Sequence, residues 1–249
     1  MDDVRPYLAR IAYTGSMVPN ATTLRGLHRA HMMTVPFENL DIARGREIVC
    51  DEERFLQKIV EQRRGGFCYE MNGAFAALLR GLGFKVTLFS ARVPRADGSP
   101  GPEFDHLTLR VDLESPWLAD VGFGDSFLEP LRLELGTEQA QDGSSFRIVE
   151  EGGSLHVERV DADGGWKREY SFSLTPRQLG DFAAMCHYHQ TSPESPFTHK
   201  SICSRATPDG RITLAERKLI ITRNGHRSEA ALTDAEYERT LRQEFGIWL

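Results

Sequence analysis

The chain has 249 residues, of which 40% are hydrophobic and 27% charged, a composition typical of a folded globular protein rather than a disordered one. The formal net charge of −6 argues against nucleic-acid binding, which needs a basic face. No apolar run reaches the roughly 18 residues that span a bilayer, and the acidic start lacks a signal-peptide pattern, so we expect a cytoplasmic protein with no membrane partner.

The first third of the chain shows the apolar spacing of helices. Repeats within residues 7–11 and 24–32 indicate two short helices. A third is expected to begin after the N-cap residue Asp51 and to stop before Gly65. Residues 35–41 contain a proline and lack helical periodicity, which predicts a loop.

Cys68 follows two glycines and begins a strongly amphipathic helix that ends near Gly81. The apolar residues that trace this helix are Met71, Ala74, Phe75, Leu78, Leu79 and Leu82. Unpaired backbone N–H groups and the helix dipole stabilise a thiolate at such a position, and they lower a cysteine pKa from ~8.5 to between ~3.5 and ~7.5. The position predicts a nucleophile, and the simpler alternative is a small buried residue at a helix start.

From Phe84 the apolar period changes to two. The runs at 84–88, 107–113, 146–148 and 155–157 indicate an antiparallel sheet, which we expect to form a small barrel. Thr175-Pro176 has the pattern of an N-cap followed by proline, and it predicts a helix that extends to about His187.

The last part of the chain begins with a loop at 191–196, where we expect a domain boundary. Strands on either side of Asn224-Gly225 are expected to form a hairpin with a type I′ turn. The capping box at 233–236 begins the last helix.

Cysteines and histidines outside the nucleophile motif give no metal signal. The four cysteines form no C-x-x-C pair, so we expect reduced thiols. The cluster Cys186-His187 with His189 lacks a second ligand pair at zinc-site spacing. His28 and His31 share a helix face, and we expect each to be solvated or at the edge of the core.

His106 and Asp120 are the candidate partners of Cys68. His106 opens a strand whose odd positions are apolar, and Asp120 ends the next strand, so both stand at even positions. If the two strands pair as a hairpin around 114–116 in an even register, both side chains lie on one face. A thiolate nucleophile needs a histidine to exchange protons and a carboxylate to orient that histidine. Cys68, His106 and Asp120 therefore form a candidate catalytic triad.

These residues resemble three motifs of the arylamine N-acetyltransferases. The motifs are Arg64-Gly65-Gly66-Phe67-Cys68-Tyr69-Glu70, His106 with its alternating strand, and Asp120-Val121-Gly122-Phe123-Gly124. Residues 35–40 are similar to that family's N-terminal loop motif, and 195–197 and 210–214 match it more weakly.

The resemblance implies an α+β fold with a cysteine-protease-like Cys-His-Asp arrangement. Residues 1–83 would form an N-terminal helical bundle with the nucleophile, 84–190 an antiparallel β-barrel with the histidine and aspartate, and 191–249 a C-terminal α/β lid. The resemblance also implies acetyl-CoA as the acyl donor, no metal, and a ping-pong reaction through a thioester on Cys68. The acceptors would be arylamines, arylhydrazines or N-hydroxyarylamines.

The same resemblance implies roles for three phenylalanines. Phe37 and Phe123 would line the acceptor pocket, with ordinary core packing as the alternative, and Phe197 would contact the pantetheine arm of CoA. For Arg64, beside the nucleophile, we predict a structural role, a buried ion pair with Glu38.

Other functions use the same residue types. An amide synthase that closes macrolactams would carry the same triad and differ in its donor pocket. A cysteine hydrolase or transglutaminase-like enzyme would pass the acyl group to water or to a protein amine. A non-catalytic thiol protein or redox sensor would need no contribution from His106 to the reactivity of Cys68.

Overall fold

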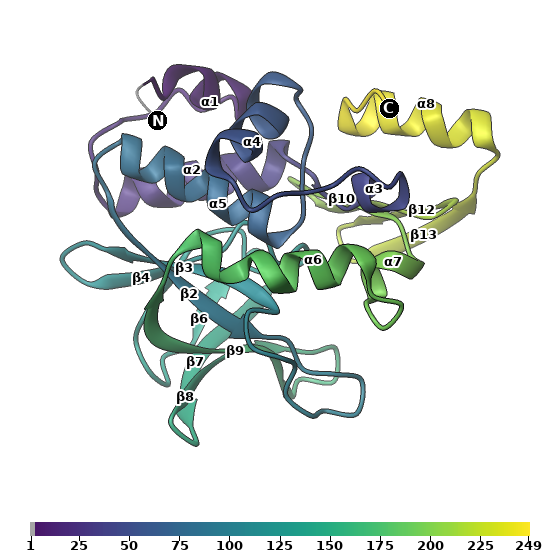
Figure 1. The fold of residues 1–249 in the computed structure, drawn as a ribbon. Helices are drawn as coiled ribbons and strands as arrows, with labels where there is room; N and C mark the ends of the chain where they lie inside the picture. Colours follow the sequence, from purple (N-terminus) through teal and green to yellow (C-terminus); the bar gives the residue numbers. More distant parts are fainter. Residues whose placement is uncertain (1–2) are drawn as a thin grey trace.

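The computed structural model describes residues 3–249, and the chain begins with helices that share one apolar core (Figure 1). These elements are α1 (Arg5–Arg10), α2 (Ala21–Thr34), α3 (Leu40–Ala43), α4 (Glu52–Leu56), a π-helical turn (Gln57–Glu61) and α5 (Cys68–Gly81). The Asp51 side chain accepts the Arg54 N–H at 2.9 Å, which confirms the predicted N-cap.

Helix α5 is buried along its whole length up to Leu79. Its large apolar side chains pack among the other helices and against strands of the barrel, in a core that includes Phe75, Leu78, Leu107 and Leu109. The predicted helix is thus confirmed. The face that an amphipathic helix would expose to water is also covered by other parts of the chain.

Eight antiparallel strands follow and form a nearly closed barrel, in the order β5-β4-β3-β2-β9-β8-β7-β6. They are β2 (Lys85–Arg92), β3 (His106–Asp112), β4 (Pro116–Ala119), β5 (Leu131–Arg132), β6 (Gln139–Gln141), β7 (Ser144–Glu151), β8 (Ser154–Val160) and β9 (Trp166–Arg177). A second apolar cluster, with Phe89, Phe146 and Tyr170, fills the barrel. The predicted period-two runs coincide with β2, β3, β7 and β8, except that Phe84 and Leu113 lie one residue outside β2 and β3.

Two glutamine side chains join the end strands of the barrel. Gln139 accepts the Arg132 N–H at 2.7 Å and donates to the Arg132 carbonyl at 3.0 Å. Gln141 does the same to Glu129, at 2.9 and 2.8 Å. Each side-chain amide thus makes the two hydrogen bonds that a backbone peptide group of a neighbouring strand would make. The backbone N–H and C=O groups of Arg132 and Glu129 are therefore paired, although β5 is an end strand of the sheet.

The helix that we predicted from Thr175-Pro176 to about His187 is wrong at its start, because the helical segment begins only at Leu179. Both residues belong to β9, where Pro176 stands opposite Phe89 next to an irregularity in the pairing with β2. A bulge tolerates a proline because no ladder bond needs its missing N–H. A 3₁₀ turn (Leu179–Phe182), capped at Gln178, then leads into α6 (Ala183–Thr191). In Figure 1, α6 lies between the barrel and the N-terminal helices.

Four strands that follow the short helix α7 (Pro196–His199) join β1, from the first part of the chain, in a second sheet with the order β1-β10-β11-β12-β13. Its strands are β1 (Phe37–Glu38), β10 (Ile202–Thr207), β11 (Gly210–Ala215), β12 (Lys218–Arg223) and β13 (His226–Ala231), and α8 (Asp234–Phe245) packs on it. The hairpin at Asn224-Gly225 and the capping box of Thr233 with Glu236 are confirmed.

The loop predicted for residues 35–41 contains two short regular elements. Strand β1 pairs with β10, with Phe37 opposite Ser204, and α3 starts at Leu40. Local sequence did not predict β1 because its hydrogen-bonding partner lies far along the chain. The predicted α+β order of helices, barrel and α/β segment is confirmed, whereas the domain limits at 83/84 and 190/191 stay predictions.

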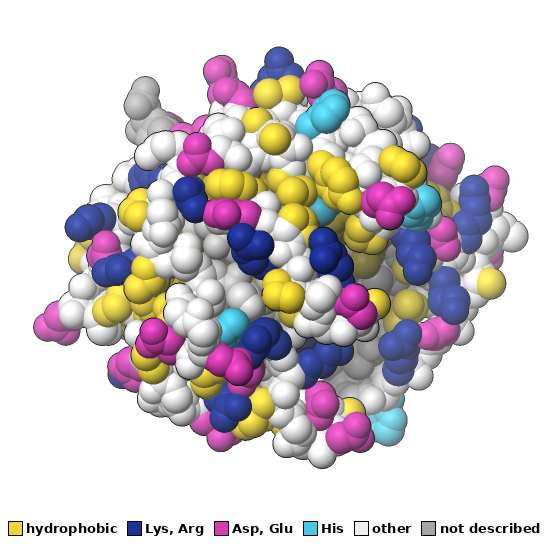
Figure 2. Space-filling model, turned by 60° about the horizontal axis from the view of Figure 1, so that its bottom comes forward, with side chains coloured by type: hydrophobic (Ala, Val, Ile, Leu, Met, Phe, Trp, Pro, Cys, Tyr) yellow, Lys and Arg dark blue, Asp and Glu magenta, His cyan; other side chains and the backbone are white. Residues whose placement is uncertain are grey.

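The surface shows no single basic region on the face drawn in Figure 2, where Lys and Arg side chains are interspersed with Asp and Glu. Within residues 3–249, no helix is long and apolar enough to cross a membrane. The cytoplasmic location stays a prediction.

Candidate active site

Cys68 is the first residue of α5 and is 4% exposed. Gly65 is needed because the chain passes close to the segment that contains β1, and a Cβ at Gly66 would lie 2.6 Å from the Glu70 side chain. A Cβ added at Gly65 would lie 1.8 Å from the carbonyl oxygen of Pro36, so only glycine fits there. Glu70 caps the helix by accepting the Phe67 N–H at 3.1 Å. The motif therefore holds the Cys68 side chain at a fixed, capped helix start.

His106 and Asp120 lie together, as the predicted hairpin requires. Strands β3 and β4 pair with Val111 opposite Trp117, an even register that places both side chains on one face. His106 Nε2 is 2.6 Å from Asp120 Oδ2, and both residues are buried. The other ring nitrogen, Nδ1, is therefore the one left to exchange a proton with a nucleophile.

Two backbone segments bring this pair to Cys68. The N–H of Leu107, the residue after His106, faces the Cys68 sulfur. From the other side, a Cβ added at Gly122 would lie 2.9 Å from both the Cα and the carbonyl oxygen of Cys68. The Asp120 segment thus packs directly on the first turn of α5. The three candidate residues belong to one buried site.

Burial raises the pKa of the Cys68 thiol well above its ordinary value. The N–H groups of Leu107 and Tyr69 act in the opposite direction, whereas the charges of Asp105 and Asp120 raise it further. The expectation that the helix start alone acidifies Cys68 is therefore wrong, because desolvation outweighs it. An ionised sulfur here needs a cation beside it.

Asp120 is charged in spite of complete burial. Burial by itself raises its pKa, but the charge of His106 and hydrogen bonds from His106, Asn72 and Gly122 outweigh burial and lower the pKa below its usual range. Asn72 Nδ2 donates to Asp120 Oδ1 at 2.8 Å, and the Gly122 N–H donates to the same oxygen at 3.0 Å. The carboxylate therefore keeps Oδ2 for His106.

Asn72 was not predicted from the sequence. It follows Cys68 by one helical turn, and its Nδ2 also donates to the Leu107 carbonyl at 2.6 Å while its Oδ1 accepts the Val121 N–H at 2.9 Å. One amide thus connects α5, β3 and the Asp120 segment. The available signal was a polar residue at the i+4 position from Cys68, on a face of the helix that is otherwise apolar.

Two aromatic rings flank His106. Phe123 meets it edge-on, with centroids 5.3 Å apart, and Tyr170 lies tilted at 5.2 Å. Phe123 also borders a cavity of about 940 Å³ whose wall includes Val93, Trp166 and Glu169. Phe123 therefore joins the histidine to an open space. Tyr170, in β9, was not predicted because its proximity to His106 depends on the pairing of β2 with both β3 and the distant β9.

Phe37 and Phe197 lie together beside the nucleophile motif. Their ring centroids are 6.4 Å apart, and Phe197 also packs edge-on against Phe67, the residue before Cys68, at 5.9 Å. Both rings are partly buried against the main core. The ring of Phe37 also lies next to Gly124.

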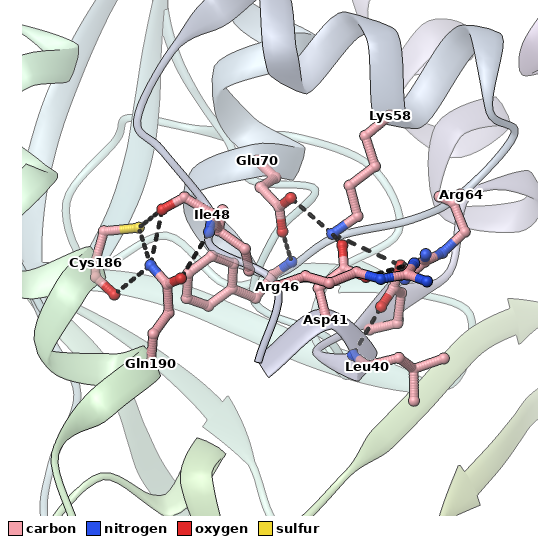
Figure 3. A network of polar contacts seen from close by, with 11 residues as sticks. Leu40, Asp41, Arg46, Ile48, Lys58, Arg64, Glu70, Cys186 and Gln190 are labelled. Atoms are coloured by element: carbon pink, nitrogen blue, oxygen red, sulfur yellow. Dashed lines mark hydrogen bonds and ion pairs between the residues drawn. The ribbon is translucent and has the colours of Figure 1, made fainter. Parts of the chain in front are cut away.

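A buried ion cluster supports the nucleophile motif (Figure 3). Arg64 Nη2 is 2.8 Å from Glu38 Oε1, which confirms the predicted ion pair, and Asp41 lies at 3.2 Å from the same nitrogen. Lys58 joins Asp41 at 2.8 Å to the capping residue Glu70 at 2.7 Å. The cluster thus connects the β1–α3 segment to the cap of α5.

The charges of the cluster depend on one another. Burial raises the pKa of Glu70 to about 7, against the effect of Lys58. Burial lowers the pKa of Lys58, but the three carboxylates outweigh it and the net shift is upward. Removal of either cation would leave uncompensated buried carboxylates.

The remaining histidine and cysteine candidates have separate partners. His189 Nε2 is 3.1 Å from Asp105 Oδ1, and the Cys186 sulfur contacts the Ile48 carbonyl at 3.6 Å. Among the described residues, no group of three or more His, Cys, Asp and Glu side chains is arranged as a metal site. His28 and His31 are both fully buried in the helical core, so the solvated or core-edge expectation was wrong.

The chain matches the family model described as N-acetyltransferase over residues 20–249. It is similar to the pineal gland isozyme of arylamine N-acetyltransferase from Gallus gallus, with 36% identity over 99% of this chain and 94% of the relative. Among solved structures, the arylamine N-acetyltransferase of Mycobacterium marinum in complex with CoA is 33% identical and superposes with a TM-score of 0.91, covering 98% of this chain and 93% of the other.

A third match is the arylamine N-acetyltransferase of Bacillus cereus, described as having a unique Cys-His-Glu catalytic triad. It is 27% identical, and the superposition has a TM-score of 0.92 and covers 100% of both chains. In the present chain, the acidic residue next to the histidine is the shorter Asp120.

Proposed function

This chain belongs to the arylamine N-acetyltransferase family and is an acyltransferase, and we propose that it moves the acetyl group of acetyl-CoA to an aromatic amine through a thioester on Cys68. The observation that carries the proposal is the His106–Asp120 contact of 2.6 Å, in a site where the Leu107 N–H and Gly122 both adjoin Cys68.

The nucleophile is an ion pair of Cys68 thiolate and His106 imidazolium. Burial alone keeps the thiol protonated, so the sulfur ionises only when its proton moves to the histidine beside it. Asp120, held in its charged form, stabilises the imidazolium and fixes the ring so that Nδ1 faces the sulfur. The pair is the activated unit, rather than the cysteine alone.

In the first half-reaction, the thiolate adds to the thioester carbonyl of acetyl-CoA. The new carbon–sulfur bond forms as the bond to CoA breaks, and CoA leaves as a thiol with the proton of His106. The N–H of Cys68 and its neighbours at the helix start are the candidate donors to the oxyanion, and a donor of this kind contributes ~3–4 kcal/mol in other enzymes.

In the second half-reaction, the amine nitrogen attacks the acetyl-enzyme. The carbon–nitrogen bond forms, the bond to Cys68 breaks, and His106 takes the amine proton, which restores the ion pair. We propose that Phe123, beside His106 and at the cavity edge, and Phe37 bind the ring of an arylamine, arylhydrazine or N-hydroxyarylamine.

Phe197 is proposed to contact the pantetheine arm of the donor. Its ring lies partly exposed against Phe67 and Phe37, next to the start of α5, so an arm that delivers a thioester to Cys68 would pass it. Substitution Phe197→Ala should then raise the KM for acetyl-CoA and leave single-turnover deacetylation by the amine unchanged.

Mass spectrometry of the protein after exposure to acetyl-CoA, with and without aniline, tests the proposed function. We expect one acetyl group on Cys68 that persists without amine and disappears when aniline is added. Cys68→Ser should carry no thioester, whereas Cys50→Ser, which removes a more exposed thiol, should behave like the native chain.

The alternatives give other results. Loss of the acetyl group without amine would indicate a hydrolase, and an acetyl-enzyme inert to aniline and phenylhydrazine would favour an amide synthase or transglutaminase-like reaction. A protein that acquires no acetyl group would be a thiol protein of another kind. Each of these outcomes contradicts the proposal.

A further inference from the structure

His28, on α2, lies under the segment that carries Asp120 and Phe123. It is completely buried, and both of its ring nitrogens contact that segment. Nδ1 is 2.8 Å from the Leu128 carbonyl oxygen, and Nε2 is 3.1 Å from the Asp120 backbone nitrogen. One imidazole thus connects to both ends of residues 120–128.

The two partners determine which ring nitrogen of His28 carries the proton. A carbonyl oxygen only accepts, so Nδ1 carries a hydrogen and donates it to Leu128. A backbone N–H only donates, so Nε2 is bare and accepts from Asp120. Complete burial lowers the pKa of His28 to about 4, which keeps the ring neutral at physiological pH.

Aromatic side chains hold the ring in this orientation. Phe127 stacks on His28 with centroids 5.7 Å apart and an interplanar angle of 22°. Phe75, from α5, meets it edge-on at 5.9 Å. Rotation of the imidazole would break these contacts together with both hydrogen bonds, so the ring is a rigid support for the Asp120 segment.

The Asp120 backbone needs this support because the β ladder ends just before it. The last pairing between β3 and β4 joins Leu109 to Ala119, so the next N–H, that of Asp120, has no strand partner. Nε2 of His28 supplies the missing acceptor. Asn72 holds the Asp120 carboxylate from the other side.

We propose that His28 is a positioning residue for acetyl transfer, which fixes the Asp120 main chain so that its carboxylate stays within hydrogen-bond reach of His106. This inference rests on the proposed function, because it assigns importance to Asp120 only through the triad. It assigns His28 no contact with acetyl-CoA or amine.

Two amide substitutions separate the two hydrogen bonds of His28. In His28→Gln, the amide oxygen can take the place of Nε2 and accept from Asp120, while the bond to Leu128 is lost. In His28→Asn, the amide nitrogen can take the place of Nδ1 and donate to Leu128, while the bond to Asp120 is lost. The pair therefore tests which contact matters for the reaction.

His31 provides matched controls. It is a fully buried histidine on the same helix, packed edge-on against the same Phe75 at 5.3 Å. Within the described chain, the only polar contact of its side chain is with Tyr7, at 3.4 Å. His31→Gln and His31→Asn should lower the melting temperature as the His28 variants do, without reaching the Asp120 segment.

The measurements are kcat/KM for acetyl transfer, the melting temperature, and the pH dependence of Cys68 alkylation by iodoacetamide. We expect His28→Asn to lower kcat/KM by roughly 10- to 100-fold, the loss that follows a displacement of about 1 Å in a catalytic group. The midpoint of its alkylation profile should shift upward, because the imidazolium loses its partner. His28→Gln and both His31 variants should keep the native midpoint.

The outcomes separate this inference from the proposed function. If Asp120→Asn is folded and active, the triad itself is wrong. If Asp120→Asn is inactive while His28→Asn matches His31→Asn in activity and in alkylation midpoint, only the role of His28 is refuted. Should His28→Asn not fold, His28→Gln is compared with His28→Leu, which offers the Asp120 N–H no acceptor. A native midpoint in His28→Gln with a raised midpoint in His28→Leu supports the inference, and equal midpoints in the two variants refute it.

Discussion

Replacement of Asp120 by asparagine should inactivate the enzyme through a change in the histidine tautomer. Two fixed donors, Asn72 Nδ2 at 2.8 Å and the Gly122 N–H at 3.0 Å, point at Oδ1 of residue 120. Asn72 cannot reverse its amide, because it is held by the Leu107 carbonyl and the Val121 N–H. The asparagine oxygen must therefore occupy the Oδ1 position.

The asparagine NH₂ group then takes the Oδ2 position and faces His106 Nε2. Two donors cannot share a hydrogen bond, so Nε2 becomes the acceptor and the ring proton moves to Nδ1, the nitrogen that must receive the proton of Cys68. The variant also loses the negative charge that stabilises the imidazolium. In triads of this kind, the corresponding substitution lowers kcat by about 10⁴-fold, or ~5.5 kcal/mol.

The assay is the single-turnover rate of Cys68 acetylation by acetyl-CoA, followed by mass spectrometry, with circular dichroism to confirm folding. Asp112→Asn is the matched control, because Asp112 lies in the same hairpin but contacts Arg110 at 2.6 Å instead of the site. A folded Asp120→Asn protein that acetylates Cys68 within about tenfold of the native rate would refute the tautomer argument.

Three further predictions concern stability and packing. Arg64→Ala should lower the free energy of unfolding by about 3–5 kcal/mol, measured by urea denaturation, because it leaves buried carboxylates unpaired; a stable variant with only a raised acceptor KM would contradict this. Gly122→Ala should slow Cys68 acetylation by about tenfold or more, because the new methyl group would lie 2.9 Å from the Cys68 backbone, whereas Gly180→Ala, with nothing within 4 Å, should not. Burial lowers the pKa of His28 from 6.5 to about 4. Between these two pH values the unfolded chain binds more protons than the folded chain does. The free energy of unfolding should therefore fall by up to about 3 kcal/mol as the pH drops from 6.5 to about 4. Urea denaturation at pH 7 and pH 5 should show a smaller fall for His28→Gln, and an equal fall would exclude His28 as a cause.

The three residues of the proposed triad could be predicted from the sequence because each stands in a pattern with strong local rules. Cys68 begins a helix whose period is plain, and the shared parity of His106 and Asp120 follows from one hairpin. The register that confirmed it, Val111 opposite Trp117, leaves both side chains on one face. Where a single turn connects two strands, alternation is enough to predict which side chains meet.

The residues that contact Asp120 from other elements could not be predicted in the same way. Asn72 and His28 act through contacts with segments more than 30 residues away, and their own neighbours in sequence do not reveal those partners. The helix start predicted at Thr175-Pro176 was wrong for a related reason, because the pairing of β9 with β2 overrides a local helix-start signal. The acidity expected for Cys68 was wrong because a dipole argument ignores how deeply the sulfur is buried.

Strand β1 has a mechanical consequence for the C-terminal segment. Phe37 and Glu38 form the first strand of the sheet that residues 202–231 complete, and the Asn39 side chain accepts the Ile202 N–H at 2.7 Å. Movement of that sheet as a rigid unit would break this pairing and separate the ring of Phe37 from Gly124. We therefore expect both substrates to bind while β1 stays paired with β10. A chain shortened to its first 190 residues would lose the strand that pairs with Phe37 and Glu38.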